Sequence, residues 1–160
     1  FSHEQFITAL PDIQDDHLPG LLQFQFPCGQ SQLGNPVADY LDALGWIREI
    51  GGVDAAIERS RRSLAVIEAF VAEHEWIHFL ARERSQRSST SVCLSVDLAP
   101  DRVKALVALL DGESVAHDIG AYRDAPAGLR IWCGGTVETA DIEAILPWLA
   151  WAFEAEISRS

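Results

Sequence analysis

The sequence predicts an α+β fold with two layers, in which a small, mainly antiparallel sheet is covered by helices on one side. Segments with apolar residues at helical spacing alternate with short β-branched runs that fit strands. The chain has 160 residues and is 48% hydrophobic, which suits one domain with a buried core. We expect an irregular segment at residues 1–35, where prolines recur without a period, and one folded domain at residues 36–160.

Two helices are predicted at the start of the folded domain. The first begins at Pro36, has apolar residues at helical spacing, and ends at Gly51-Gly52, a common stop signal. The second is longer and runs from Val53 to Glu75. Its apolar face is expected to carry Ile57, Leu64, Ile67 and Val71. Its solvent face is expected to carry Arg59, Arg62 and Glu73.

The remainder of the chain predicts four short strands and two helices. The strands are expected at residues 76–80, 90–96, 114–120 and 128–134, and a polar connection separates the first two. One helix is expected from Pro100 to Leu110, where Gly112 stops it. The last helix is expected from Thr139 to about Ile157. Thr139 is predicted to cap it, Asp141 to lie in its first turn, and Pro147 to kink or restart it.

Charge and cysteine content restrict the function classes. The net charge of −12 argues against binding to nucleic acid or to an anionic membrane, which requires basic surface. No apolar run approaches the roughly 18 residues of a membrane span, and no signal peptide opens the chain. The cysteines Cys28, Cys93 and Cys133 form no C-x-x-C pair, so we expect free thiols in a cytoplasmic protein.

The stretch His74-Glu75-Trp76-Ile77-His78 matches H-E-x-x-H, in which two histidines on one helix bind zinc and the glutamate acts as a base. A zinc hydrolase is therefore an alternative function. The predicted boundary between helix and strand falls inside this stretch, and an extended backbone would separate the histidines by about 13 Å. Ala81 and Arg84 also stand where an extended zinc motif needs Gly and His. We expect no metal site here.

Two arginines near the C-terminal strand are candidate anion ligands. Arg123 lies in a predicted loop, and Arg130 lies in an apolar strand between Leu129 and Ile131. A planar guanidinium suits bidentate binding of a carboxylate or a phosphate. Residue spacing alone also allows each arginine a role without a ligand. Arg123 would pair with the nearby Asp118 or Asp124, and Arg130 would face solvent.

Three stretches carry a resemblance to a known family. The longest is AYRDAPAGLRIWCGGTVETADIEAILPWLAWAFEAE, and the others are RSSTSVCLSV and DYLDALGWIREIGGVDAAIERS. Together they resemble the C-terminal end of phosphoserine aminotransferases, in the branch typical of alphaproteobacteria, from about Asp39 to Glu156. These enzymes use pyridoxal phosphate and have the aspartate aminotransferase fold type. The resemblance implies that this chain forms the small C-terminal domain of that fold.

The resemblance also implies an activity and site residues. The family transfers an amino group between glutamate and 3-phosphohydroxypyruvate, giving 2-oxoglutarate and O-phosphoserine in serine biosynthesis, and acts as a homodimer. By its pattern Arg123 would bind the substrate phosphate, with Tyr122 beside it as an uncharged donor. Arg130 would bind the substrate carboxylate. Asn35 would contact the cofactor phosphate of a neighbouring subunit, although a family threonine is missing before Pro36.

Catalysis by this chain alone is not expected. The family's Schiff-base lysine lies in a large domain upstream of the matched stretches, and Lys104 matches no such motif. The chain also begins at Phe1 without methionine, so we expect a fragment that is inactive by itself and has no catalytic residue. The alternative is a non-catalytic remnant that dimerises or binds a partner. Its apolar surface would come from Trp148, Trp151 and Phe153 near the C-terminus, although burial in the core is the simpler role for them.

Overall fold

The computed structural model describes residues 36–159. The chain divides into two compact units, Phe1–Ala43 and Leu44–Ser160. Of the first unit, the described residues comprise only the beginning of one helix. The predicted irregular segment at residues 1–35, with Asn35 and Cys28, lies outside the described residues, and the boundary expected at residue 36 stays a prediction.

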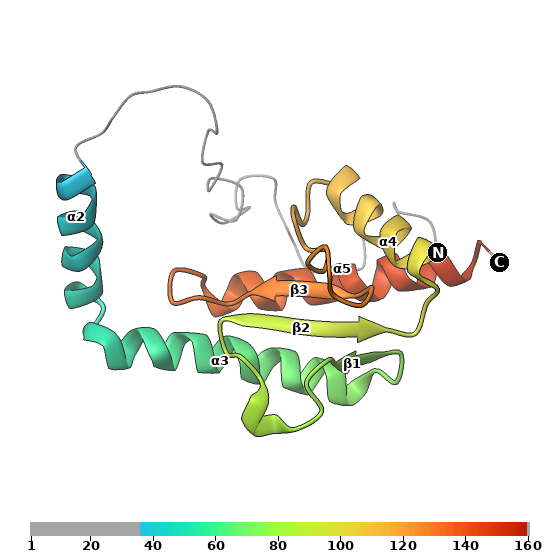
Figure 1. Cartoon of the computed structure of the whole chain (residues 1–160), viewed down its shortest axis with the longest axis horizontal. Helices are drawn as coiled ribbons and strands as arrows, with labels where there is room; N and C mark the ends of the chain where they lie inside the picture. The colour runs from blue at the N-terminus through green and yellow to red at the C-terminus, as the bar shows by residue number, and fades with distance from the viewer. Residues whose placement is uncertain (1–35, 160) are drawn as a thin grey trace. The chain divides into compact units, whose positions relative to one another are not determined.

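The described chain is an α+β fold, as predicted (Figure 1). Its three strands form one antiparallel sheet in the order β1-β2-β3. The elements in chain order are α2 (Pro36–Glu49), α3 (Gly52–Glu73), β1 (Ile77–Phe79), the short 3-10 helix η1 (Arg84–Gln86), β2 (Ser91–Val96), α4 (Pro100–Gly112), β3 (Leu129–Trp132) and α5 (Thr139–Ile157). None of these helices is long and apolar enough to cross a membrane.

Helices α2 and α3 meet at a glycine turn, as the sequence predicts. Gly51 and Gly52 have φ values of +109° and +83°, in the region that residues with a side chain rarely adopt. These two positions therefore end α2 and let α3 begin.

The predicted apolar face of α3 is wrong in part. The residues buried along the helix are Ser60, Ser63, Ile67 and Phe70. Ile57 is 41% exposed, whereas Arg59, expected in solvent, is half-buried. The reason is that α3 packs against α5 and the turn before it. The Arg59 Nε donates to the Gly135 carbonyl at 2.7 Å, and its Nη2 pairs with Glu138.

Helix α5 has the predicted bounds but a different start. Glu138, not Thr139, occupies the capping position, and it makes no side-chain capping bond. The Thr139 hydroxyl instead lies 3.3 Å from the Ser63 hydroxyl on α3. The helix continues through Pro147 without a restart, and Asp141 in its first turn is buried.

The apolar core lies on one face of the sheet. Along β2 the side chains of Val92, Leu94 and Val96 are buried, while the alternate residues are only half-buried. Helices α3 and α5 lie behind this sheet in Figure 1, and they pack against each other. The opposite face carries Cys93, which lies directly across from Arg130 on β3. This open face is where the candidate site begins.

The strand expected at residues 114–120 does not form. Ser114 and Asp118 adopt left-handed backbone conformations, with φ values of +56° and +54°, which interrupt an extended chain. Only an isolated bridge joins Gly120 to Leu129. The segment still follows β3, because the Arg130 N–H donates to the Ile119 carbonyl at 2.7 Å. This path brings Asp118 next to Arg130.

Candidate anion-binding site

Arg130 is the centre of the candidate site. Its side chain is only 14% exposed although it lies on the open face of the sheet. The Nη2 atom donates to the Asp118 carboxylate at 2.6 Å and to the Asp118 backbone carbonyl at 3.1 Å. The Nε atom is buried and has no hydrogen-bond partner among residues 36–159. The cation therefore faces a partner and not bulk solvent, which rules out the alternative of a solvent-facing strand residue.

Tyr122 covers the guanidinium group of Arg130. The central carbon of Arg130 lies 4.7 Å from the centroid of the Tyr122 ring, within the range of a cation–π interaction. The ring itself is 60% exposed. The structure thus brings together Tyr122 and Arg130, two of the residues that the sequence singled out, in a cation–π contact.

Arg123 follows Tyr122 in a turn closed by a hydrogen bond from the Ala125 N–H to the Tyr122 carbonyl at 3.0 Å. Its side chain is exposed and has no hydrogen bond or ion pair within the described part of the chain. The sequence left open a pairing of Arg123 with Asp118 or with Asp124, and neither is seen in the described part of the chain. Asp118 pairs with Arg130 instead. Arg123 is therefore available to an anion from solvent.

Gly128 fixes where β3 starts. A Cβ atom at this position would overlap the backbone carbonyl of Leu94 on β2. The Gly128 carbonyl also accepts a hydrogen bond from the Ala121 N–H at 3.1 Å, on the side of the segment that carries Tyr122. A residue without a side chain is needed for this close approach to β2. The glycine thereby allows β3, which carries Arg130, to start at this point.

The H-E-x-x-H stretch does not form a zinc-binding helix. Helix α3 ends at Glu73, and His74 has an extended backbone with φ −125° and ψ 112°. His74 bonds to the Phe70 carbonyl through Nδ1 at 2.8 Å, whereas His78 lies on β1 and pairs with Asp97 at 3.1 Å. The prediction that a helix end and a strand divide this stretch is confirmed. Within residues 36–159, no three His, Cys, Asp or Glu side chains are grouped as a metal site.

The same stretch contributes to packing instead. The Trp76 ring stacks on Phe153 of α5, with centroids 4.2 Å apart and planes 9° apart. The His74 ring stacks on Phe70 at 4.0 Å. Trp151 is buried, as the simpler role for the C-terminal aromatics required. These contacts join the end of α3 to α5.

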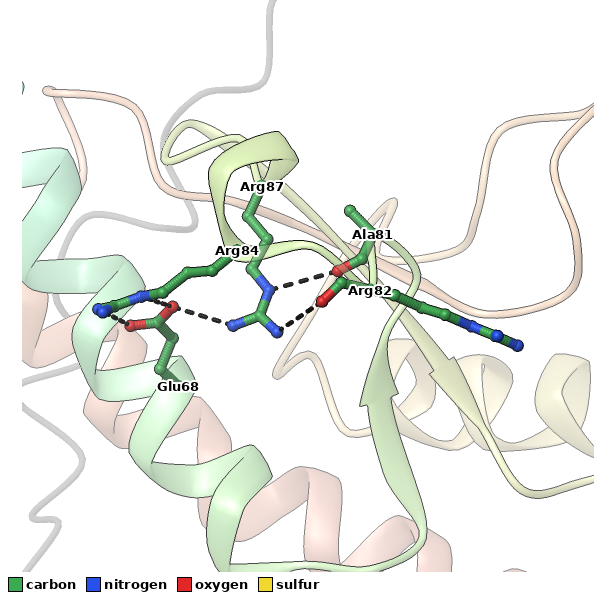
Figure 2. Close-up of polar contacts among 5 residues, drawn as sticks. All are labelled: Glu68, Ala81, Arg82, Arg84 and Arg87. Atoms are coloured by element: carbon green, nitrogen blue, oxygen red, sulfur yellow. Dashed lines mark hydrogen bonds and ion pairs between the residues drawn. The ribbon is translucent and has the colours of Figure 1, made fainter.

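A second group of arginines was missed by sequence analysis. Glu68 on α3 binds both Arg84 and Arg87 from the loop between β1 and β2 (Figure 2). Arg84 uses Nε and Nη2, at 3.0 and 2.7 Å from the two carboxylate oxygens. The hydrogen bond from Arg84 is the main cause of a lowered pKa for Glu68, and it outweighs the effect of burial, which raises the pKa.

Arg87 completes this cluster. Its Nε and Nη2 atoms donate to the carbonyls of Ala81 and Arg82 (Figure 2). Its guanidinium also lies 3.9 Å from the centroid of the Phe79 ring. The dense set of arginines in ARERSQR could have indicated this cluster, but their partner, Glu68, lies in the preceding helix and is not apparent from the local sequence. Because both guanidinium groups already bind the Glu68 carboxylate, we assign the cluster to holding the loop and not to ligand binding.

The chain is similar to curated enzymes. It is 52% identical over 116 residues to a phosphoserine aminotransferase from Methanosarcina mazei, which covers 72% of this chain and 31% of that protein. A phosphoserine aminotransferase from Methanosarcina barkeri is 52% identical over 115 residues, with the same coverage. The chain thus spans about a third of the length of these relatives. No family model matches it.

Solved structures agree with the fold. A phosphoserine aminotransferase from Bacillus circulans subsp. alkalophilus superposes with a TM-score of 0.62 at 18% identity, covering 72% of this chain and 30% of that chain. The corresponding structure from Cytophaga hutchinsonii gives a TM-score of 0.55 at 15% identity, covering 67% and 28%. The predicted family and fold class are confirmed. The assignment to a particular branch stays a prediction.

Proposed function

The chain is homologous to about a third of a phosphoserine aminotransferase, and we propose that it is the part that holds the two anionic ends of the substrate. The observation that carries this proposal is the pair of cations beside β3. Arg130 is half-buried with an unpartnered Nε, and Arg123 is exposed seven positions earlier in the chain. A protein with a net charge of −12 needs such local cations to attract an anionic ligand.

The two arginines suit different groups of one ligand. O-phosphoserine and 3-phosphohydroxypyruvate carry a carboxylate at one end and a phosphate at the other. A half-buried guanidinium binds a planar carboxylate through two parallel N–H groups. An exposed guanidinium suits a phosphate, which keeps part of its hydration. We assign Arg130 to the carboxylate and Arg123, with the Tyr122 hydroxyl, to the phosphate.

Pyridoxal phosphate belongs to the proposed activity, but this chain's residues do not fit covalent attachment of the cofactor. The chain has one lysine, Lys104, and it lies exposed on α4. A lysine that forms a Schiff base needs a desolvated or cationic setting that lowers its pKa. We therefore propose that amino transfer between glutamate and 3-phosphohydroxypyruvate requires residues outside this chain. We also propose that the complete enzyme is a cytoplasmic homodimer.

Binding of O-phosphoserine tests the proposal. The 160-residue chain is titrated with O-phosphoserine and followed by NMR, comparing Arg123→Gln and Arg130→Gln with the wild type. Both variants are expected to weaken binding about tenfold, the range of a hydrogen bond to a charged group. Arg61→Gln, which removes an exposed arginine of α3, is the matched control and is expected to bind as the wild type. Equal binding by all four chains would contradict the proposal.

An interaction surface is the second candidate function. Three apolar side chains from α2 and the start of α3 are exposed, Leu44 at 41%, Val53 at 67% and Ile57 at 41%. Exposed apolar side chains mark a protein contact where they form one continuous patch, which self-association through these three would require. The molar mass in solution, measured by light scattering, tests this candidate. A monomer at all concentrations would contradict self-association through these residues.

A further inference from the structure

We propose that the Asp118 side chain is an internal competitor, a carboxylate that occupies Arg130 and that a substrate carboxylate must displace. The inference rests on the proposed role of Arg130 in the substrate site. It adds a residue that sets how strongly the site holds carboxylates. Asp118 contacts Arg130 through both its carboxylate and its backbone carbonyl, at 2.6 and 3.1 Å from Nη2.

The edge of the Arg130 guanidinium is only half used. In any arginine, the Nε and Nη2 hydrogens point along one edge, which matches the two oxygens of a carboxylate. Arg84 shows the complete arrangement in this chain, since each of these nitrogens bonds one oxygen of Glu68 (Figure 2). Arg130 bonds Asp118 through Nη2 alone, and its Nε is buried without a partner. A carboxylate aligned on this edge would gain a bond that Asp118 does not make.

The Asp118 side chain can rotate away from Arg130 into water. Its side chain is 90% exposed, so its carboxylate loses little hydration in the present contact and regains the rest when it turns into water. The backbone beneath it stays anchored, because the Arg130 N–H donates to the Ile119 carbonyl at 2.7 Å. Rotation of one side chain is therefore enough to release the Nη2 atom from the internal carboxylate.

Competition of this kind raises the apparent dissociation constant of any carboxylate in inverse proportion to the fraction of time that Arg130 is free. A ligand with one carboxylate has to overcome Asp118 unaided. A ligand that also carries a phosphate adds the contact with Arg123. Asp118 would therefore weaken both kinds of ligand by the same factor, and the second contact at Arg123 is what would let a ligand with two anionic groups still bind.

Acetate is the probe that isolates this effect, because it carries a carboxylate and nothing else. The wild-type chain and the Asp118→Asn variant are titrated with acetate at constant ionic strength, with the backbone amide resonances of β3 and of the segment before it as the reporter, since these remain in every variant. Asparagine keeps the size of the side chain and tolerates a positive φ. We expect Asp118→Asn to lower the apparent dissociation constant for acetate by about three- to tenfold. Asp124→Asn removes an exposed charge from the same loop and is expected to stay within twofold of the wild type.

The outcomes separate this inference from the proposed function. Unchanged or weaker acetate binding by Asp118→Asn, or no binding by either chain, overturns the role of Asp118 as a competitor. An equal gain in Asp124→Asn also overturns it, because the effect would then be one of net charge. The double variant Asp118→Asn/Arg130→Gln is expected to lose acetate binding. If it binds as Asp118→Asn does, Arg130 is not the carboxylate site and the proposed function itself is wrong.

Discussion

The guanidinium of Arg130 lies over the ring of Tyr122, with 4.7 Å between the ring centroid and the central carbon of the arginine. This contact gives Tyr122 a task that its sequence position did not suggest. The ring restricts the plane of the cation, and the hydroxyl remains free to donate to a phosphate. The two tasks belong to different atoms of one side chain, so they can be separated by substitution.

Substitution of Tyr122 is expected to show which task matters. Tyr122→Phe keeps the cation–π contact and removes the hydroxyl, so a change of less than twofold in O-phosphoserine affinity would assign the residue to Arg130. Tyr122→Ala removes the cation–π contact, which is worth about 0.5–1 kcal/mol at an exposed site, and is expected to weaken binding about two- to fivefold. Calorimetric titration of both variants measures this. A large loss in Tyr122→Phe would instead assign the residue to the phosphate.

Gly128→Ala is expected to destabilise the fold. The added Cβ meets the Leu94 carbonyl, and backbone on both sides prevents an easy shift, so we expect a loss of about 1–3 kcal/mol or more in unfolding free energy. Gly112→Ala at the end of α4 is the control, because no atom lies within 4 Å of its added Cβ. That control is expected to be neutral or slightly stabilising. Urea denaturation measures both, and similar stabilities would contradict the close approach at Gly128.

The Glu68 cluster predicts an acid-dependent loss of stability. Arg84 and Arg87 lower the pKa of Glu68 below its ordinary value of 4.5, so the folded state holds this proton less tightly than the unfolded state. The stabilisation is therefore present above pH 4.5 and is lost as the pH falls through the lowered pKa.

Glu68→Gln is expected to cost about 1–2 kcal/mol at neutral pH, since Arg87 is left half-buried with a weaker partner while the exposed Arg84 contributes little. The difference from the wild type should shrink as the solution is acidified. Glu58→Gln on the exposed side of the same helix is expected to show neither effect. Thermal unfolding at several pH values measures this, and a constant difference down to pH 2–3 would contradict the account.

The cysteines are expected to differ in reactivity. Burial raises the pKa of Cys133 to about 12, so almost none of it is thiolate at neutral pH. Cys93 is half-buried on the open face of the sheet. Alkylation of the native chain with iodoacetamide, followed by peptide mass spectrometry, should label Cys93 well before Cys133. In denaturant the two are expected to react at similar rates, and rapid native labelling of Cys133 would show that it is not buried.

Local patterns in the sequence were enough for most of the elements. Alternation predicted β2, and a proline with a later glycine predicted a helix from Pro100 to Leu110, which in the structure continues to Gly112 as α4. The face of α3 was mispredicted because small hydroxyl residues, Ser60 and Ser63, are buried against α5, and hydrophobic spacing does not detect them. The left-handed backbone at Asp118, which removes a predicted strand, has no local signature of its own.

The candidate site was also predicted only in part, because local patterns do not show which distant side chains meet in the fold. The arginines Arg123 and Arg130 were found because charged groups in apolar or loop surroundings need partners. The actual partner of Arg130 is Asp118, at a sequence separation of 12, and local patterns do not show which side chains such a separation brings together. Asp118 was considered as a partner for Arg123, and the path of the backbone along β3 gives it to Arg130 instead.

The central claim is that Arg130 binds the carboxylate of the ligand and Arg123 its phosphate. Its most direct test compares O-phosphoserine with O-phosphoethanolamine, which lacks the carboxylate, in calorimetric titrations of the wild type and of Arg130→Gln. The account predicts that Arg130→Gln weakens O-phosphoserine binding about tenfold and leaves O-phosphoethanolamine binding within twofold of the wild type. Equal losses for the two ligands, or no loss for O-phosphoserine, would contradict it.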